Sequence, residues 1–212
     1  MNISKPANII SYYVLCHKLK DIIRTGWKKW HVKRERLESV AEHIYGVQML
    51  AIAMYSEYNY DLNIEKVILM LALHELEEIM IGDLIPFEVT KSEKINLGHK
   101  AVHDILSNLS KRAELESLIH EFDAQQTPEA KFAHLCDKLE ADIQCKIYDT
   151  EGCVNWKAEA DNELLRNSKV NAAVDFDKSW SDCWIACDQS LNLYDTNFIE
   201  VLEYLRDNPI QL

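Results

Sequence analysis

Hydrophobic residues recur at helical spacing along nearly the whole chain of 212 residues. Apolar side chains follow one another at steps of three and four, and no sustained alternation of apolar and polar residues is bounded by turn residues. The pattern therefore predicts an all-α protein. The expected helices are 4–23, one that starts at residue 40, 64–81, 92–109, 113–124 and 128–148, followed by shorter ones at 156–167, 176–191 and 196–206.

Several helix starts carry capping signals. Ser39 and Glu42 have the spacing of a capping box, in which each side chain bonds the other's backbone N–H, so a helix is expected from the residue after Ser39. Asn63 is a good N-cap for the next helix, and Pro128 suits the first position of a later one. The segment 24–38 contains a glycine and many basic residues, and it is predicted to be a loop.

Composition fits one compact globular domain over residues 1–212. The chain is 48% hydrophobic, with 5 glycines, 4 prolines and no flexible linker, so the residues from 153 onward are expected to pack on the same core. The longest strictly apolar run, residues 67–73, falls far short of the roughly 20 residues that span a bilayer. We find no signal peptide and no C-x-x-C pair among six cysteines, and we expect a reduced, cytoplasmic protein.

The charge distribution narrows the range of possible binding partners. With 23 basic and 35 acidic residues, the chain has a net charge of -12, which disfavours nucleic-acid polymers and anionic membranes as partners. Residues 20–36 depart from this balance, since they hold seven basic and two acidic residues. That stretch suits the capture of a small anion, although a solvated basic loop beside acidic neighbours would have the same composition.

The predicted helix 64–81 carries polar residues where its buried face should continue. His74, Glu75 and Glu78 lie in register with the apolar stripe that precedes them. Burying an unpaired carboxylate costs several kcal/mol, so such a group normally has a cation, a metal or an opening to solvent beside it. The alternative is that the end of the helix simply emerges into water.

Two further residues are ambiguous when taken singly. His43 shares a helix face with Val40 and Val47, where a histidine is more often a core residue with satisfied hydrogen bonds than a ligand. Asp137 lies off the main apolar stripe of its helix, on a second stripe with the small residue Ala133. Alone it would be interpreted as a solvated aspartate.

Four polar segments follow one another along the chain: RTGW (24–27), ESVAEH (38–43), LHELEEIMIGD (73–83) and KFAHLCD (131–137). Together, in this order, they resemble the HD-domain metal-dependent phosphohydrolases, and most closely their 5'-deoxyribonucleotidase-like branch. The resemblance covers roughly residues 24–148, and it implies an HD-type helical bundle.

By this resemblance, one divalent metal ion (Mn, Co, Mg or Zn) would be held by His43, His74, Glu75 and Asp137. Glu75 stands where the family has an aspartate, and carboxylates of either length bind hard divalent cations. The pair His103-Asp104 also spells the family's name, but it lacks the downstream carboxylate and Gly-Asp pair, so we interpret it as a decoy.

The resemblance also implies the chemistry. Glu78 and Asp83 would be catalytic, Arg24 would bind the substrate phosphate, and the substrate would be a small nucleotide, a (deoxy)nucleoside monophosphate that loses its 5'-phosphate. A homodimer is also implied. Two alternatives stay open: a nucleoside triphosphate hydrolase on the same scaffold, and a non-catalytic binding or regulatory module with a degenerate His-Glu site.

Other site classes fail on spacing. The segment HELEE at 74–78 differs from the zinc-protease motif H-E-x-x-H because Glu78 replaces the second histidine. The chain contains no P-loop and no G-x-G-x-x-G, so a nucleotide would be held by charge and metal.

Overall fold

The computed structural model describes residues 4–85, 89–192 and 194–210. Helices and the turns between them make up this described part, which contains no strand beyond one isolated antiparallel bridge between Ile23 and Ser39. The prediction of an all-α fold is confirmed. The helices are α1 (Lys5–His17), η1 (Lys18–Lys20), α2 (Thr25–Lys29), α3 (Val40–Glu57), α4 (Ile64–Leu71), α5 (Glu78–Ile81), α6 (Lys91–Leu106), α7 (Arg112–Ala124), α8 (Pro128–Thr150), η2 (Trp156–Asp161), η3 (Glu163–Arg166), α9 (Ser168–Asn171), α10 (Trp180–Leu191) and α11 (Thr196–Asp207).

The helices form two compact units. The first contains the described residues of 1–25 and 38–134, and the second those of 26–37 and 135–212. Helix α8 is continuous across the division, which falls inside it after His134. The single domain expected over residues 1–212 stays a prediction.

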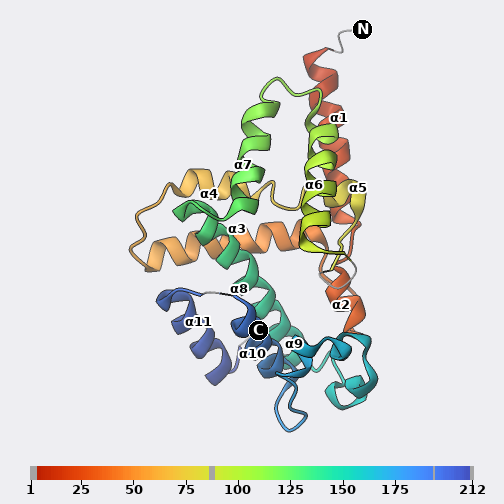
Figure 1. Ribbon diagram of the computed structural model, residues 1–212, viewed down its shortest axis with the longest axis vertical. Coiled ribbons are helices and arrows are strands. Elements are labelled where there is room, and N and C mark those ends of the chain that lie inside the picture. The colour runs from red at the N-terminus through yellow and green to blue at the C-terminus, as the bar shows by residue number, and fades with distance from the viewer. Residues whose placement is uncertain (1–3, 86–88, 193, 211–212) are drawn as a thin grey trace. The chain divides into compact units, whose positions relative to one another are not determined.

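In the first unit, α6 and α7 form a helical hairpin, and α1 also packs on α6 (Figure 1). Leu76 and Leu106 belong to the apolar core that these helices and the chain after α4 bury together. Burial of such side chains contributes about 1.5–3 kcal/mol each and holds the elements in register. The residues that follow α4 are therefore anchored by their apolar neighbours.

The capping signals predict the helix starts well. Ser39 and Glu42 form both bonds of a capping box, and α3 begins at the next residue. The Asn63 side chain accepts the Lys66 N–H at the start of α4, and α8 begins at Pro128 as expected.

The predicted helix 64–81 is wrong in one respect, because it is interrupted. Helix α4 ends at Leu71, residues 72–77 form turns, and α5 begins only at Glu78. In the interruption the backbone bonds tighten to three-residue steps, for example from the Leu76 N–H to the carbonyl of Leu73. Gly82 ends α5 with φ of 74°, a conformation that favours glycine.

The helix expected over 4–23 is shorter, since α1 ends at His17 and η1 ends at Lys20, and two other predicted segments differ more strongly from the structure. The loop expected over 24–38 contains the short helix α2, with Gly26 inside it. The helix expected over 156–167 consists of two 3-10 helices, η2 and η3, which meet at Asn162. The Asn162 side chain accepts the Leu164 N–H and so begins η3, while its backbone N–H bonds to the carbonyl of Glu159 and ends η2.

The second unit is organised around tryptophans. All five tryptophans of the chain lie in it, and the Trp27 ring is stacked on that of Trp184 with centroids 5.3 Å apart. Trp27 and Trp180 are almost completely buried. Two basic residues of the stretch 20–36 have acidic partners in this unit: Lys29 with Glu163, and Arg34 with Glu151. The solvated-loop interpretation of that stretch therefore holds for part of it.

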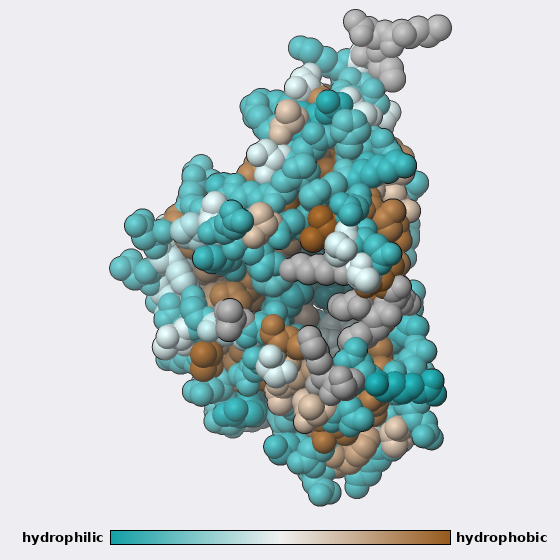
Figure 2. All heavy atoms as spheres, viewed as in Figure 1, coloured by the Kyte–Doolittle hydropathy of each residue, from teal (hydrophilic) through white to brown (hydrophobic). Residues whose placement is uncertain are grey.

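Hydrophilic residues predominate on the face drawn in Figure 2, in keeping with a chain of which 27% is charged. Within the described ranges, no helix combines the length and the hydrophobicity that crossing a bilayer requires. All six cysteines lie in those ranges, and none of them forms a disulfide there.

Candidate metal centre and its surroundings

A short backbone pairing fixes the entrance to α3. The Arg24 N–H donates to the carbonyl of Glu38 at 3.0 Å, and the Val40 N–H donates to the carbonyl of Ile22 at 2.8 Å. These bonds flank the Ile23–Ser39 bridge and tie the segment before α2 to the first turn of α3. Arg24 is thereby held near the helix that carries His43.

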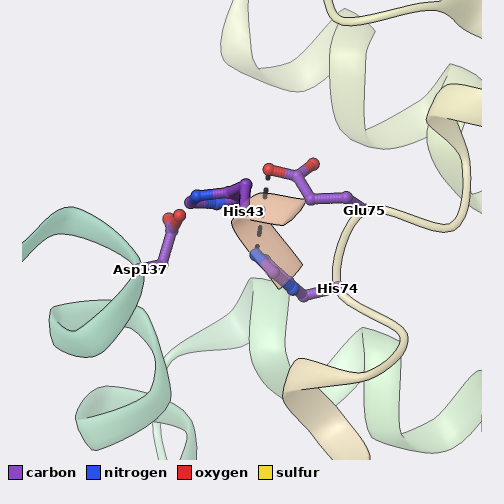
Figure 3. A group of neighbouring side chains, drawn as sticks. All are labelled: His43, His74, Glu75 and Asp137. Carbon is purple, nitrogen blue, oxygen red and sulfur yellow. Dashed lines mark ion pairs between the residues drawn. The ribbon is translucent and has the colours of Figure 1, made fainter. Parts of the chain in front are cut away.

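The structure brings the four expected ligands together. His43 lies on α3, His74 and Glu75 lie in the turns after α4, and Asp137 lies on α8, three residues beyond His134 (Figure 3). Each offers a ligand atom, and these atoms all lie within 4.8 Å of one another. His43 is fully buried, and His74 and Asp137 are nearly so. His43 and Asp137 thus belong to one group of side chains, and their role as metal ligands stays a prediction.

The second histidine is oriented by the backbone. Its Nδ1 lies 2.8 Å from the carbonyl oxygen of Leu71, and since a carbonyl only accepts, Nδ1 of His74 must carry the proton. The lone pair is then on Nε2, the atom that lies 3.9 Å from Oε1 of Glu75. A histidine fixed in this way is prepared to bind a metal through Nε2.

The carboxylates of the group also have cationic neighbours. The Arg24 guanidinium lies 3.6 Å from Oε1 of Glu75, and both side chains are largely buried. Lys138 Nζ donates to Oδ2 of Asp137 at 2.9 Å. These contacts restrict the two carboxylates before any ligand arrives.

The donor set fits a divalent metal. Two imidazoles and two carboxylates supply two nitrogen and two oxygen atoms, a combination that Mn²⁺, Co²⁺ and Zn²⁺ accept. Burial removes competing water, and the fixed Nε2 of His74 faces the carboxylate of Glu75. These four residues therefore suit the divalent metal ion that the family resemblance implied.

Glu78 lies one turn beyond Glu75 and is almost completely buried, like His43. Its side chain is 0% exposed, and Oε1 lies 3.6 Å from Nζ of Lys94 on α6. Burial raises the pKa of Glu78 well above the ordinary range of a glutamate, and the charges of Glu75 and Asp83 raise it further, while Lys94 opposes them. A carboxyl group whose pKa is raised keeps its proton more readily than an exposed glutamate, which suits general acid chemistry.

Its neighbour Glu77 shares this environment. Burial, with the charge of Glu75, raises the pKa of Glu77 to about 8. Burial alone would lower the pKa of Lys94, but the surrounding carboxylates outweigh it and raise that pKa, so Lys94 stays cationic.

Asp83 has a structural contact that the sequence did not reveal. The Thr25 N–H donates to its Oδ2, and the Thr25 hydroxyl donates to its carbonyl oxygen at 2.8 Å. Asp83 thus ties the end of α5 to the residue that follows Arg24. Thr25 and Asp83 lie in two separate sequence motifs, and only the presence of both motifs in one chain could have suggested this contact.

The structure also shows which other histidine and acidic residues lie in a group that could hold a metal. His103 is exposed and pairs with Glu116 at 3.1 Å, and neither it nor Asp104 belongs to a metal-competent group among the described residues. A second such group, which sequence reasoning missed, contains Glu38, His43 and Glu140. Glu38 carried a weak signal, since it immediately precedes the capping serine.

Comparison with known proteins places the chain in a family. The HD domain family matches residues 16–180, and the chain belongs to it. It is 32% identical over 145 residues to "5'-deoxynucleotidase HDDC2" of Danio rerio, covering 67% of this chain and 70% of that protein. It is 31% identical over 156 residues to "5'-deoxynucleotidase hdd1" of Schizosaccharomyces pombe, covering 70% and 76%.

Solved structures agree in fold. A predicted metal-dependent phosphohydrolase from Magnetospirillum magnetotacticum superposes with a TM-score of 0.65 at 22% identity, covering 97% of this chain and 95% of that one. The PH0347 protein from Pyrococcus horikoshii gives a TM-score of 0.67 at 20% identity, covering 93% and 98%. The protein is an HD-domain phosphohydrolase related to 5'-deoxynucleotidases at about 30% identity.

Proposed function

We propose that this protein hydrolyses the 5'-phosphate of nucleoside monophosphates, with deoxyribonucleotides as the favoured substrates, using one divalent metal ion. The observation that carries the proposal is the convergence of His43, His74, Glu75 and Asp137 within 4.8 Å, in a relative of proteins named as 5'-deoxynucleotidases. The chain offers no glycine-rich phosphate loop, so phosphate recognition falls to charged side chains.

The metal ion, when bound, would lower the pKa of a coordinated water and neutralise phosphate oxygens. The four ligands would hold it, with His74 bound through Nε2 because Nδ1 is committed to the Leu71 carbonyl. Glu75 takes the place of the family's aspartate. Its longer side chain reaches both His74 and Arg24, at 3.9 Å and 3.6 Å.

Arg24 would bind the phosphate of the substrate. Its guanidinium lies beside the ligand group, and its planar fork matches two phosphate oxygens. The backbone pairing with Glu38 and the contact between Thr25 and Asp83 fix the segment on both sides of Arg24. Asp83 therefore has at least a positioning role beside the catalytic one that the resemblance implies.

Glu78 would move the proton. Its buried carboxyl group holds a proton more tightly than an exposed glutamate, so it can protonate the leaving 5'-oxygen and afterwards accept a proton from water. Such a positioned group accelerates hydrolysis by roughly 10²- to 10⁴-fold.

A nucleotide panel tests the proposal. Purified protein is incubated with Mn²⁺, Co²⁺ or Mg²⁺ and each of the ribo- and deoxyribonucleoside mono- and triphosphates, while phosphate and triphosphate release are followed separately. Phosphate release from deoxyribonucleoside monophosphates, lost with EDTA, supports the proposal. Triphosphate release from nucleoside triphosphates would replace it with the triphosphohydrolase alternative, and metal binding without hydrolysis of any nucleotide would favour a binding module.

A further inference from the structure

A lysine from a neighbouring helix reaches the buried carboxyl group that the proposed reaction uses. Lys94 lies in the first turn and a half of α6, and its Nζ is 3.6 Å from Oε1 of Glu78. Glu78 is 0% exposed, whereas the Lys94 side chain is 31% exposed. Lys94 is thus partly open to solvent, whereas the carboxyl group that it approaches is not.

The start of α6 is held by a capping box. Thr90 and Glu93 form both bonds of a capping box, with the Thr90 N–H donating to Glu93 at 3.0 Å and the Glu93 N–H donating to the Thr90 hydroxyl at 3.3 Å. Lys94 follows this box directly. Helix α6 packs on α5, the four-residue helix in which Glu78 is the first residue.

Lys94 places a positive charge beside Glu78, whose neighbours Glu75 and Asp83 are acidic. The carboxylates of Glu75 and Asp83 act on Glu78 with the same sign, and Lys94 is the group that opposes them. Once Glu78 has given its proton to the leaving oxygen, it is a buried carboxylate, and such a group keeps its place only with a cation beside it. Lys94 is therefore suited to hold the Glu78 carboxyl group in place, together with the short helix that carries it.

We propose that Lys94 is a positioning residue, whose ammonium group holds the Glu78 carboxyl group at the place from which it serves the reaction. The inference rests on the proposed function for its kinetic meaning, but the position of Glu78 can be observed without any substrate. Lys94 itself makes no contact with the phosphate or the metal in this account.

The kinetic test compares Lys94→Met, which keeps the length of the aliphatic stem but removes the charge, with Lys94→Arg, which keeps the charge. Lys100→Met on the exposed side of the same helix is the matched control. With dAMP and saturating Mn²⁺, we expect Lys94→Met to lower kcat by about 10- to 100-fold, within the worth of a positioned acid or base, and to change KM by less than about 3-fold. Lys94→Arg should recover most of kcat, and Lys100→Met should match the wild type.

A double-mutant cycle with Glu78→Gln separates positioning from a general loss of stability. If Lys94 acts through Glu78, adding Lys94→Met to Glu78→Gln should change kcat by less than about 3-fold, because the residue to be positioned is already inactive. An equal fall in both backgrounds would overturn the inference, and so would an unchanged kcat in Lys94→Met.

Crystal structures of the wild type, Lys94→Gln and Lys94→Arg provide a test that does not depend on activity. We expect the Glu78 carboxyl group to be displaced in Lys94→Gln and to keep its place in Lys94→Arg. A wild-type protein that hydrolyses no nucleotide would refute the proposed function alone. Glu78 in the same position in all three structures would refute the role of Lys94, whatever the substrate.

Discussion

Arg24→Ala separates substrate capture from chemistry. The substitution removes a guanidinium group whose side chain is 17% exposed and lies 3.6 Å from Oε1 of Glu75. A charge-assisted bond to phosphate in such a place is worth about 1.5–3 kcal/mol, which corresponds to a loss of roughly 10- to 150-fold in kcat/KM. If the contact is equally strong in the ground state and the transition state, the whole loss falls on KM.

The assay measures initial rates of phosphate release from dAMP over a range of substrate concentrations at saturating Mn²⁺. Metal affinity is measured in parallel by titration, since Arg24 also neighbours Glu75. Lys28→Ala is the matched control, because Lys28 is an exposed cation of the same basic stretch and its loss changes the net charge equally. We expect Lys28→Ala to change KM by less than about 3-fold, as surface charges act weakly in salt.

Two results would refute this reasoning. Arg24→Ala with full metal occupancy and unchanged kcat/KM would show that the guanidinium does not bind the substrate. Equal losses in Arg24→Ala and Lys28→Ala would show that the basic stretch attracts the nucleotide by its overall charge and not through one positioned fork.

Three further sets of substitutions test separate features. Glu75→Asp should retain the metal and Glu75→Ala should weaken its binding, as measured by Mn²⁺ titration; equal affinity in wild type and Glu75→Ala would remove Glu75 from the ligands. Gly98→Ala should gain less than the usual 0.5–1 kcal/mol of a helix interior, because its Cβ would lie 3.3 Å from Cγ of Glu77, and urea unfolding should show the full gain in a Glu77→Ala background and not in the wild type. Burial beside Asp188 raises the pKa of Asp142, so its protonated form stabilises the fold at low pH and this contribution is lost as pH rises toward the raised pKa. Between the ordinary pKa of an aspartate and the raised pKa of Asp142, the stability of Asp142→Asn relative to the wild type should therefore increase by up to about 1.4 kcal/mol per pH unit. A pH-independent difference in the free energy of unfolding would contradict the raised pKa.

Much of the fold and of the candidate site could be predicted from the sequence because the signals were local. Capping by Ser39 and Asn63 depends on residues a few positions apart, and both helix starts are where the pattern put them. The order of the polar segments, through its resemblance to the family, indicated which residues would lie close together. The structure adds the proximity of His43 to Asp137, which is a property of the tertiary fold.

The parts that the sequence did not reveal depend on long-range contacts. The interruption of the helix at residues 72–77 keeps the apolar spacing of an uninterrupted helix, so periodicity alone could not detect it. The contact of Thr25 with Asp83 and the reach of Lys94 to Glu78 join residues that no local pattern connects. The expected homodimer stays a prediction.

The most direct test of the central claim is the metal content of the protein and of two matched histidine variants. Elemental analysis of chelator-free protein, together with Mn²⁺ titration, should give about one divalent ion per chain in the wild type and in His103→Ala, and almost none in His74→Ala. His103 is the control because it is exposed and pairs with Glu116 away from the ligand group. Retention of the metal in His74→Ala, or its loss in His103→Ala, would contradict the assignment of the site.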